Sequence, residues 1–456
     1  MNISSLKTKL LYFLLAGLIP ATALSQKIDP TLEILIQKAL EKNHGLNVNQ
    51  LEGEQARVDQ KQAKAVFLPE ITLNGSYTRL NDDITFDEDT QNLLMSTQKL
   101  LIKEAAGLPF NADFPENIPL QPASNLQDKN ILKSSVDLDW VLFSGFEATN
   151  ALKAAKHKEA SLNFVGEAEK DKIVLNLIET YDKLALVNAS QEVLAASEDH
   201  LKDQERFVKK AIENGLATPI SRKKIELAQQ QLEAKQLEFR QNKRLLVEVL
   251  HQITGENREI LRSLSPQLNA ITFTGNSAEK RAEVQALEEA EKAADYKSKM
   301  EKSNFIPKLA LKGHYEFLED DLSLLDPQWY VGVGIKWNVF DGGKSKLKSR
   351  KSQLEAQKYQ EKIKEAEEMI SLSIVKAEMS YEAALQNTRI AQKEIELAEA
   401  TFEMLKKQHR NDLASISDVL DGLRDLESAN FKLQESYFDQ SKAATTLMHA
   451  KGILNY

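Results

Sequence analysis

The chain of 456 residues contains no cysteine, and aromatic residues make up only 7 % of it. Without cysteine it forms no disulfide and cannot carry a lipid on an N-terminal cysteine. Beyond its N-terminal segment it has no apolar run near the roughly twenty residues that a transmembrane helix requires. If the chain spans a membrane, the spanning part must therefore consist of strands.

Basic residues are outnumbered by acidic ones, so the formal net charge is −9. This balance argues against a protein that binds nucleic acid. The seven histidines include no pair four residues apart, so a helical zinc pair is excluded; they lie at 44, 157, 200, 251, 314, 409 and 449. Phosphate-binding loops and nucleophile elbows are missing as well. We therefore expect no catalytic residue, no metal, no cofactor and no enzyme activity.

The N-terminal segment, 1–25, has the three parts of a secretory signal peptide. Lys7 and Lys9 precede an apolar run from Leu10 to Ile19, and small residues follow up to Ser25. The alternative is an N-terminal membrane anchor, but this apolar run is too short to span a bilayer. We expect cleavage near Ser25 and export of the mature chain.

A strand followed directly by a long helix occurs twice. From Tyr330 to Gly343 the sequence YVGVGIKWNVFDGG alternates apolar and other residues with the period of a strand. A charged run without proline follows for almost seventy residues. The segment from Ser135 to Gly145 aligns with it at an offset of 197, which pairs Trp140 with Trp337. The same offset pairs further positions downstream, so we infer an internal duplication.

The duplication predicts two repeats, 26–255 and 277–456, with an inter-repeat linker at 256–276. Each repeat would contain a helix, two strands and a helical hairpin. The first strand of one repeat aligns with the first strand of the other at an offset of 238, whereas the second strands align at 197. The loop between the two strands of the first repeat, 81–132, is therefore longer than the loop of the second repeat by the difference between these offsets. The expected strands are about 68–80, 133–143, 306–317 and 329–340, and the expected hairpins are 147–255 and 344–452.

Each long helix of nearly seventy residues would span about 100 Å at 1.5 Å per residue. That length suits a rod across the periplasm better than a globular core. Apolar residues such as Ile173, Leu177 and Leu184 recur at the spacing of coiled-coil packing.

Four strands of about ten residues suit a tilted transmembrane span but cannot close a barrel alone. An open edge is not tolerated in lipid, so several chains would share one barrel: two chains give eight strands and three give twelve. All three tryptophans lie in or beside the strands, where an interfacial girdle would place them: Trp140, Trp329 and Trp337. A soluble antiparallel sheet is the alternative reading of the alternation.

The order of the segments resembles the TolC-like outer membrane efflux proteins, or outer membrane factors, over essentially the whole mature chain. The segments that carry the resemblance are DPTLEILIQKALEKN, FLPEITLNGSYTR, WVLFSGFEATNALKAAK, ENGLATPISRKKIELAQQQLEAK, LHQITGEN and their second copies. No single motif is strong alone, but their order and their duplication are specific.

The resemblance implies a mixed α and β membrane protein. Three chains would form a homotrimer with a 12-stranded barrel in outer membrane lipid, continued by a long α-helical coiled-coil tunnel in the periplasm. It implies a passive exit duct of a tripartite efflux or type I secretion system, gated at its periplasmic tip. The implied partners are a periplasmic adaptor, or membrane fusion protein, and an inner-membrane transporter of the RND or ABC class.

Two acids match the family positions that line the periplasmic aperture, Asp418 and Asp421. Three copies of each would place six like charges around a narrow bore, which favours cations and raises some of the pKa values. The alternative is that they charge the first turn of a helix, where acids are favoured in any case.

The resemblance places adaptor docking at the two helical turns, on Gly215, Leu216 and Ala217 and on Asp412, Leu413 and Ala414. At the positions where the best-described members lock the closed state, this chain has His409, Ala414 and Ser221. Another lock could use Arg410, Arg222 or Lys224. A generic helix-hairpin turn is the alternative to a docking tip.

A soluble periplasmic coiled-coil adaptor or scaffold is the rival function. Adaptors carry one helical hairpin between lipoyl-like β domains, whereas here the whole strand–helix unit is repeated. Extraction distinguishes the two, because a membrane duct requires detergent and a scaffold does not. The transported substrate does not follow from the sequence.

Overall fold

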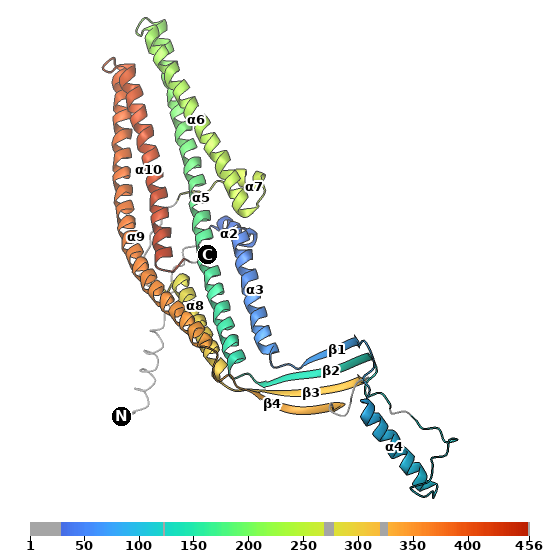
Figure 1. The fold of residues 1–456 in the computed structure, drawn as a ribbon. Helices are drawn as coiled ribbons and strands as arrows, with labels where there is room; N and C mark the ends of the chain where they lie inside the picture. The colour runs from blue at the N-terminus through green and yellow to red at the C-terminus, as the bar shows by residue number, and fades with distance from the viewer. Residues whose placement is uncertain (1–28, 122–123, 269–277, 320–326, 455–456) are drawn as a thin grey trace, which may run out of the picture. The chain divides into compact units, whose positions relative to one another are not determined.

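The computed structural model describes residues 29–121, 124–268, 278–319 and 327–454. The expected signal peptide, 1–25, lies outside these residues, as does part of the linker 256–276. In the described ranges no helix has both the length and the apolar character needed to cross a membrane. The elements, in chain order (Figure 1), are α2 (Pro30–Lys42), α3 (His44–Ala65), β1 (Glu70–Arg79), α4 (Glu88–Ala105), β2 (Asn130–Phe143), α5 (Glu147–Glu213), α6 (Pro219–Thr254), α7 (Arg258–Ser263), α8 (Ala282–Lys302), the 3₁₀ turn η1 (Ser303–Phe305), β3 (Lys308–Glu319), β4 (Trp329–Lys336), α9 (Lys344–Arg410) and α10 (Ile416–Ala450).

The sequence offset of 197 is also an offset of backbone conformation. The helices α5 and α9 have 67 residues each, and both of their ends differ by this offset. Among the described residues, each one with a positive φ has such a counterpart, apart from Gly107 in the long first loop. The pairs are Gly145 with Gly342, Phe146 with Gly343, Gly215 with Asp412 and Gly255 with Gly452. The turns of the two repeats thus bend the chain in the same way.

The four strands form one antiparallel sheet in the order β1-β2-β3-β4. Three of them lie close to the expected bounds, but β4 ends at Lys336 instead of continuing to about 340. Lys336 is paired with Lys308, the first residue of β3. Pro307, the residue before Lys308, has no N–H to donate to a ladder, so β3 does not extend further back. The chain after Lys336 therefore has no strand to pair with. Trp337 therefore lies just beyond the strand.

The segment from Asp29 to Ala65 forms two helices, α2 and α3. Asn43 has an extended backbone, with φ −66° and ψ 118°, and it ends α2. Its side-chain oxygen accepts a hydrogen bond from the N–H of Leu46 at 3.0 Å, which caps the start of α3. Asn43 therefore marks a helix boundary within a segment whose apolar residues have helical spacing.

Two further helices lie outside the expected elements. The segment expected to be only a linker contains α7, whose N-cap Asn257 accepts a hydrogen bond from the N–H of Glu259 at 2.8 Å. The long first loop also contains a helix, α4, whose N-cap Asp87 accepts a hydrogen bond from the N–H of Thr90 at 2.8 Å.

The chain folds into two compact units, and neither coincides with one half of the sequence. The helical unit comprises Met1–Asn49, Val165–Val284 and Ala366–Tyr456, and the sheet unit comprises Gln50–Phe164 and Gln285–Glu365. Each unit therefore combines elements of both repeats, and α5 and α9 contribute to both.

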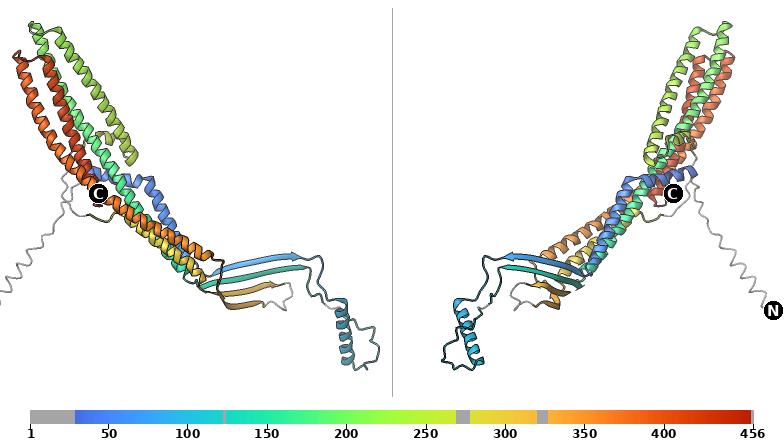
Figure 2. Two further views of the ribbon diagram at one scale, coloured as in Figure 1. Left: turned by 60° about the vertical axis from the view of Figure 1, so that its left-hand side comes forward. Right: turned by 90° about the vertical axis from the view of Figure 1, so that its right-hand side faces the viewer.

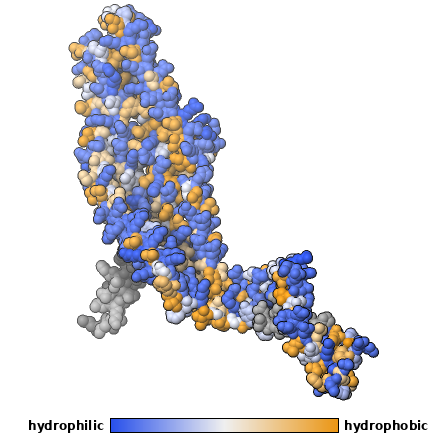
Figure 3. Space-filling view, viewed as in Figure 1, coloured by the Kyte–Doolittle hydropathy of each residue, from blue (hydrophilic) through white to orange (hydrophobic). Residues whose placement is uncertain are grey.

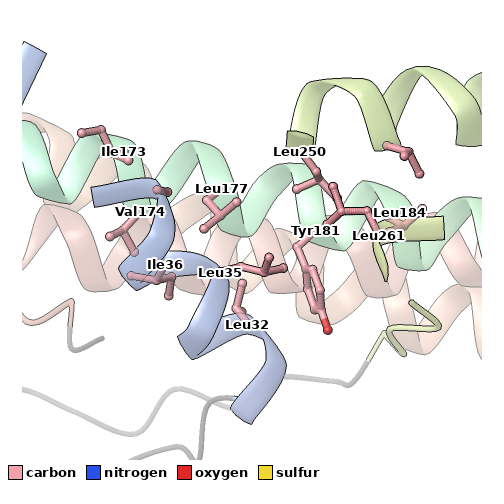
Figure 4. Close-up of a cluster of buried hydrophobic side chains, with 12 residues drawn as sticks. Leu32, Leu35, Ile36, Ile173, Val174, Leu177, Tyr181, Leu184, Leu250 and Leu261 are labelled. Atoms are coloured by element: carbon pink, nitrogen blue, oxygen red, sulfur yellow. The ribbon is translucent and has the colours of Figure 1, made fainter. Parts of the chain in front are cut away.

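The core of the helical unit includes a cluster that α2, α5, α6 and α7 build together (Figure 4). Ile36 and Leu35 of α2 lie against Leu177 of α5, and Leu250 and Leu261 close the cluster. Burying such a side chain contributes about 1.5–3 kcal/mol. A second cluster near the helical turns joins α5, α6, α9 and α10 around the fully buried Phe402.

The helices of the helical unit form two antiparallel pairs, α5 with α6 and α9 with α10, as Figure 1 and the left view of Figure 2 show. The pairs meet where α5 contacts α10 and, nearer the turns, where α6 contacts α10. Hydrogen bonds mark each of these contacts: Gln236 to Glu198 within the first pair, Thr388 to the backbone of Ser436 within the second, and Ser441 to Asp182 between the pairs. This order leaves α6 and α9 at opposite edges of the unit.

Candidate functional site

The sheet has one apolar and one polar face. Its register aligns side chains of one kind in rows across all four strands. One row of the apolar face consists of Leu73, Val136, Tyr315 and Trp329, and one row of the polar face consists of Thr72, Asp137, His314 and Tyr330. The apolar side chains are not covered, since Ile71 is 70 % and Ile335 is 74 % exposed. An exposed apolar sheet face requires an apolar environment or a partner.

The polar face is joined by hydrogen bonds between strands. Asp137 accepts from the side chain of Asn74 at 2.5 Å and lies 2.6 Å from Nδ1 of His314. The ring of Tyr330 stacks on His314 with centroids 5.3 Å apart. These contacts cross β1, β2, β3 and β4 in turn, so they hold the face together without a buried core.

Both outer strands have an open edge. Within the described chain, β1 pairs only with β2, and β4 pairs only with β3. The outward backbone N–H and C=O groups of β1 and β4 are thus available to another strand. These edges are the clearest structural sign that the sheet is incomplete alone.

Two of the three tryptophans repeat one hydrogen bond. The indole N–H of Trp140 donates to the carbonyl oxygen of Phe67 at 2.9 Å, and that of Trp337 donates to Phe305 at 3.0 Å. Donors and acceptors are equivalent in the two repeats. Trp329 lies instead on the apolar face of β4, and all three rings are exposed. Their role as interfacial aromatics stays a prediction.

The two helical turns have the same backbone. Gly215 and Asp412 are left-handed, with φ of 74° and 58°. The N–H of Leu216 donates to the carbonyl oxygen of Ala211 at 2.7 Å, and the N–H of Leu413 donates to that of Gln408 at 2.9 Å. This is the bond pattern of a Schellman motif, which satisfies carbonyls at a helix end.

Each turn presents a leucine to solvent: Leu216 is 70 % and Leu413 is 77 % exposed. The neighbouring Ala217 and Ala414 complete the two predicted docking tips. The carbonyl of Ala414 accepts a hydrogen bond from the Nδ1–H of His409 at 2.8 Å, which fixes the second turn to the end of α9. The docking role itself stays a prediction.

Both aperture candidates lie in the first turns of α10, and each has a partner in its own chain. Asp418 forms a capping box with Ser415, whose N–H donates to it at 2.7 Å. The hydrogen bonds from Ser415 lower the pKa of Asp418 from its ordinary value. Asp421 forms an ion pair with Arg424. In a single chain Asp418 therefore caps the helix, as the alternative reading expects, while the aperture role stays a prediction.

Contacts between α6 and α10 hold the two hairpins together near the turns. Lys224 donates to the hydroxyl of Ser417, and Lys235 forms an ion pair with Glu427. Of the three residues named as substitutes for the family's lock, Lys224 makes a contact between helices, whereas Arg222 binds Glu226 of its own helix at 3.0 Å. A groove of about 780 Å³ lies between these helices.

Sequence reasoning did not find Lys235 and Glu427 or the stacked rings of Phe239 and Phe431, which are 5.6 Å apart. Both contacts join residues far apart in the sequence, on different helices. A heptad alignment of α6 with α10 is the one signal that could have found them.

Apolar stripes run along the edge helices at intervals of seven residues. On α9 the exposed residues include Ile390, Leu397 and Met404, and on α6 they include Ile220 and Leu227. Figure 3 shows hydrophobic side chains interspersed with hydrophilic ones along the helices. The sheet unit repeats the pattern, with Leu51 and Val58 on α3 and with Leu347 and Leu354 on α9. Seven-residue spacing is typical of helices that pack on other helices.

In the described ranges no group of three acidic or histidine side chains could hold a metal ion.

Comparison with known proteins agrees with this architecture. Residues 275–452 match the family model described as outer membrane efflux protein. No curated protein matches the chain. Among solved structures, the outer membrane protein VceC from Vibrio cholerae is 18 % identical, with a TM-score of 0.70, over 92 % of this chain and 96 % of that one.

Two further solved structures share the fold. The Campylobacter jejuni CmeC outer membrane channel is 15 % identical, with a TM-score of 0.70, over 93 % of this chain and 86 % of that one. The open state of the Neisseria gonorrhoeae MtrE outer membrane channel is 15 % identical, with a TM-score of 0.68, over 93 % and 90 %. Residues 275–452 therefore match the outer membrane efflux protein family, and the chain shares the fold of solved outer membrane channels, in agreement with its resemblance to the TolC-like outer membrane efflux proteins.

Proposed function

We propose that three copies of this chain form a passive exit duct in the outer membrane. Three sheets would close a barrel of twelve strands, and the helices would continue it as a tunnel into the periplasm. Solutes delivered from the inner membrane would leave through this duct without any chemistry on the chain.

The observation that carries the proposal is the amphipathic sheet with two open edges. If β4 of one copy pairs with β1 of the next, the ladder continues until it closes, and every backbone group has a partner. The exposed face around Ile71 and Ile335 would then meet lipid, while the polar face around Asp137 and His314 would line the bore. Strand counting alone allows two or three copies, and the resemblance favours three.

The helical stripes support the same contact between copies. The sheet unit exposes apolar residues on α3 at one edge and on α9 at the other, and the helical unit does so on α6 and α9. A head-to-tail contact that joins α9 of one copy to α3 and α6 of the next would cover all of these stripes and would close into a ring.

The helical turns would form the periplasmic end. Asp418 and Asp421 of three copies would line the aperture there and favour cations. The turns around Leu216 and Leu413 would dock a periplasmic adaptor protein, and through it an RND or ABC transporter of the inner membrane. The duct would serve a tripartite efflux or a type I secretion system. Cleavage near Ser25 would precede assembly in the outer membrane.

Light scattering of the detergent-extracted mature protein, corrected for bound detergent, tests the proposal. We expect a protein mass near three chains, recovered only from the membrane fraction. A monomer or dimer recovered without detergent would contradict the duct and would support the soluble scaffold instead.

A further inference from the structure

Helix α4 of the long first loop has no packing partner that buries its side chains. It has 18 residues, and within the described part of the chain none of them is buried. Isolated helices of this length are only marginally stable in water, and most helices in proteins depend on the packing of an apolar face. We therefore looked for the surface that α4 would pack against.

One side of α4 is partly covered by its own loop. Met95, Gln98 and Ile102 lie on this side and are half-buried. The ammonium group of Lys103 donates a hydrogen bond to the carbonyl oxygen of Ala112, in the chain that returns from the helix. The returning chain is thus tied to α4 but leaves its other side open.

The open side carries two rows of leucine, which we call the leucine face. Leu93 and Leu100 form one row, and Leu94 and Leu101 form the other. Leu93 is 66 % exposed and Leu101 is 61 % exposed. At about 100° per residue, Thr97 lies between the two rows. Its hydroxyl donates to the carbonyl oxygen of Leu93 at 2.8 Å, so this position can be enclosed without an unsatisfied donor.

Two apolar rows on one helix fit a helix that has a neighbour on each side. In a closed ring of three helices, one row of each helix would meet the other row of the next, and the positions between the rows would face the axis. Thr90 and Glu104 continue the middle row to the two ends of α4, where both are exposed or half-exposed. A repeat of seven residues is typical of helices that pack on helices.

The attachment of α4 to the sheet makes other copies of the chain its nearest candidates. Ile84 and Gln127 pair beyond β1 and β2, and they hold the two ends of the loop together. Figure 1 shows α4 beyond the end of these strands that lies away from α3 and α5. In the proposed barrel, each of the three copies would therefore hold its α4 at the same level of the outer rim.

The dimensions of the rim allow three such helices to meet. Twelve strands spaced about 4.8 Å apart and tilted by about 40° form a barrel with a radius of about 12 Å. Three helices, each about 10 Å across, pack within a radius of about 11 Å. The α4 helices of three copies would thus fit side by side at the mouth.

The charge of α4 does not suit a lipid surface. The helix carries three acidic residues, Glu88, Asp89 and Glu104, against two basic ones, Lys99 and Lys103. Helices that lie on a membrane surface typically have a polar face rich in lysine and arginine. A contact with other α4 helices needs no such excess of basic residues.

We propose that the leucine face of α4 is a contact between copies: three α4 helices form a ring at the outer rim of the barrel. In this ring Leu93 and Leu100 of one copy pack on Leu94 and Leu101 of the next. The ring rests on the proposed function, because the shared barrel supplies the three copies.

Disulfide cross-linking tests the ring, because the sequence has no cysteine of its own. In the full-length variant Leu100→Cys/Leu101→Cys, each cysteine 100 would lie beside cysteine 101 of the next copy. We expect mild oxidation of the detergent-extracted protein to give a covalent trimer on a denaturing gel. The single variant Leu100→Cys places each cysteine beside a leucine and should remain a single chain. If the double variant does not fold, Leu93→Cys/Leu94→Cys replaces it.

The matched control is Asn92→Cys/Lys99→Cys, whose two positions are exposed on α4 but lie off the leucine face. It should not cross-link, and equal cross-linking there would overturn the ring. A double variant that gives only single chains, or that stops at covalent dimers, would also overturn it. Uncross-linked thiols that are shielded from a soluble maleimide only in phospholipid vesicles would assign the leucine face to lipid instead.

Light scattering of the same samples separates this proposal from the proposed function. A mass near three chains without cross-links between the cysteines refutes the ring alone. A wild-type mass of one chain refutes the shared barrel, whatever the cysteines show.

Discussion

Gly215 and Asp412 occupy the same place in the equivalent turns of the two repeats, and both have a left-handed backbone. Glycine adopts this conformation at no steric cost, because it has no Cβ. Aspartate tolerates it better than most residues but still carries some strain. The two tips thus have one geometry and different local stabilities.

Substitution of Gly215 should destabilise the first tip. No other atom lies within 4 Å of the place where a Cβ would be, so backbone strain alone would act in Gly215→Ala. We expect a loss of about 1–2 kcal/mol, measured as faster hydrogen exchange of the amides near the turn. Gly215→Asn is the control, with a smaller loss. Unchanged exchange in Gly215→Ala would contradict the assigned backbone.

Removal of the cap on α10 should loosen the second tip. Ser415→Ala takes away the side-chain oxygen that accepts from the N–H of Asp418, at a cost of about 1 kcal/mol. The folded pKa of Asp418 is lowered, so its stabilisation is complete above the ordinary value of 3.8 and is lost as the pH falls through the folded value. Thermal unfolding of wild type and Ser415→Ala should therefore converge in acid. A constant gap at all pH values would argue against the capping box.

Neutralisation of the aperture acids should weaken the preference for cations. If Asp418 and Asp421 line the bore, Asp418→Asn/Asp421→Asn reduces the negative potential at its narrowest part. Reversal potentials across a planar bilayer under a salt gradient measure this. Glu52→Gln/Glu54→Gln on α3 removes the same charge elsewhere and should have little effect. Unchanged selectivity in the first variant would remove both acids from the aperture.

The contact between α5 and α10 should weaken at high pH, because the buried carboxyl group of Asp182 becomes charged. Burial raises its pKa to about 6, although the hydroxyl of Ser441 donates to it at 2.6 Å. Because the folded value is raised, the stabilisation is complete below 3.8 and is lost as the pH rises through about 6. The loss is on the order of 2–3 kcal/mol.

The variant Asp182→Asn keeps an acceptor for Ser441 and removes the titration. It should raise the unfolding temperature at pH 8 and leave it nearly unchanged at pH 5. Asp199→Asn, on the exposed side of the same helix, should show no such difference. Equal pH dependence of Asp182→Asn and wild type would refute the assignment.

A charge in the α9 stripe should prevent association of the copies. Leu397 is exposed in a single chain, and in the proposed trimer it would be covered by the next copy. Leu397→Glu would bury an unpaired carboxylate there, so the light-scattering mass should fall below three chains. Glu399→Lys is exposed off the stripe and should leave the mass unchanged. A trimer of Leu397→Glu would mean that this stripe is not the contact.

Periodic patterns made much of this fold predictable. The bounds of α5 and α9 follow from uninterrupted helical composition between turns with a left-handed residue, and the alternation in β1 to β4 follows from a sheet with two unlike faces. The break at Asn43 was not predictable in this way, because it depends on one side chain that caps α3. The early end of β4 depends on Pro307, just before β3, and nothing in the sequence of β4 itself indicates it.

Some functional positions were likewise predictable from local sequence, and others were not. The turns with Gly215 and Asp412 were visible in the sequence, because only a few residue types accept a left-handed backbone. The contacts between helices were not visible in the sequence. The ion pair of Lys235 with Glu427 and the stacked rings of Phe239 and Phe431 depend on the rotation of one helix against another. Composition and spacing along a single helix do not determine that rotation.

Phe146 holds a left-handed backbone, with φ 66°, at the place where the second repeat has Gly343. Its ring packs edge-to-face on Phe143 at 5.1 Å, so an aromatic contact offsets the steric cost that glycine avoids in the other copy. The two joints thus share the bend from strand into helix but differ in the side-chain chemistry that supports it. The direction in which each long helix leaves the sheet is therefore set by the backbone conformation at this joint, which glycine is not the only residue to adopt.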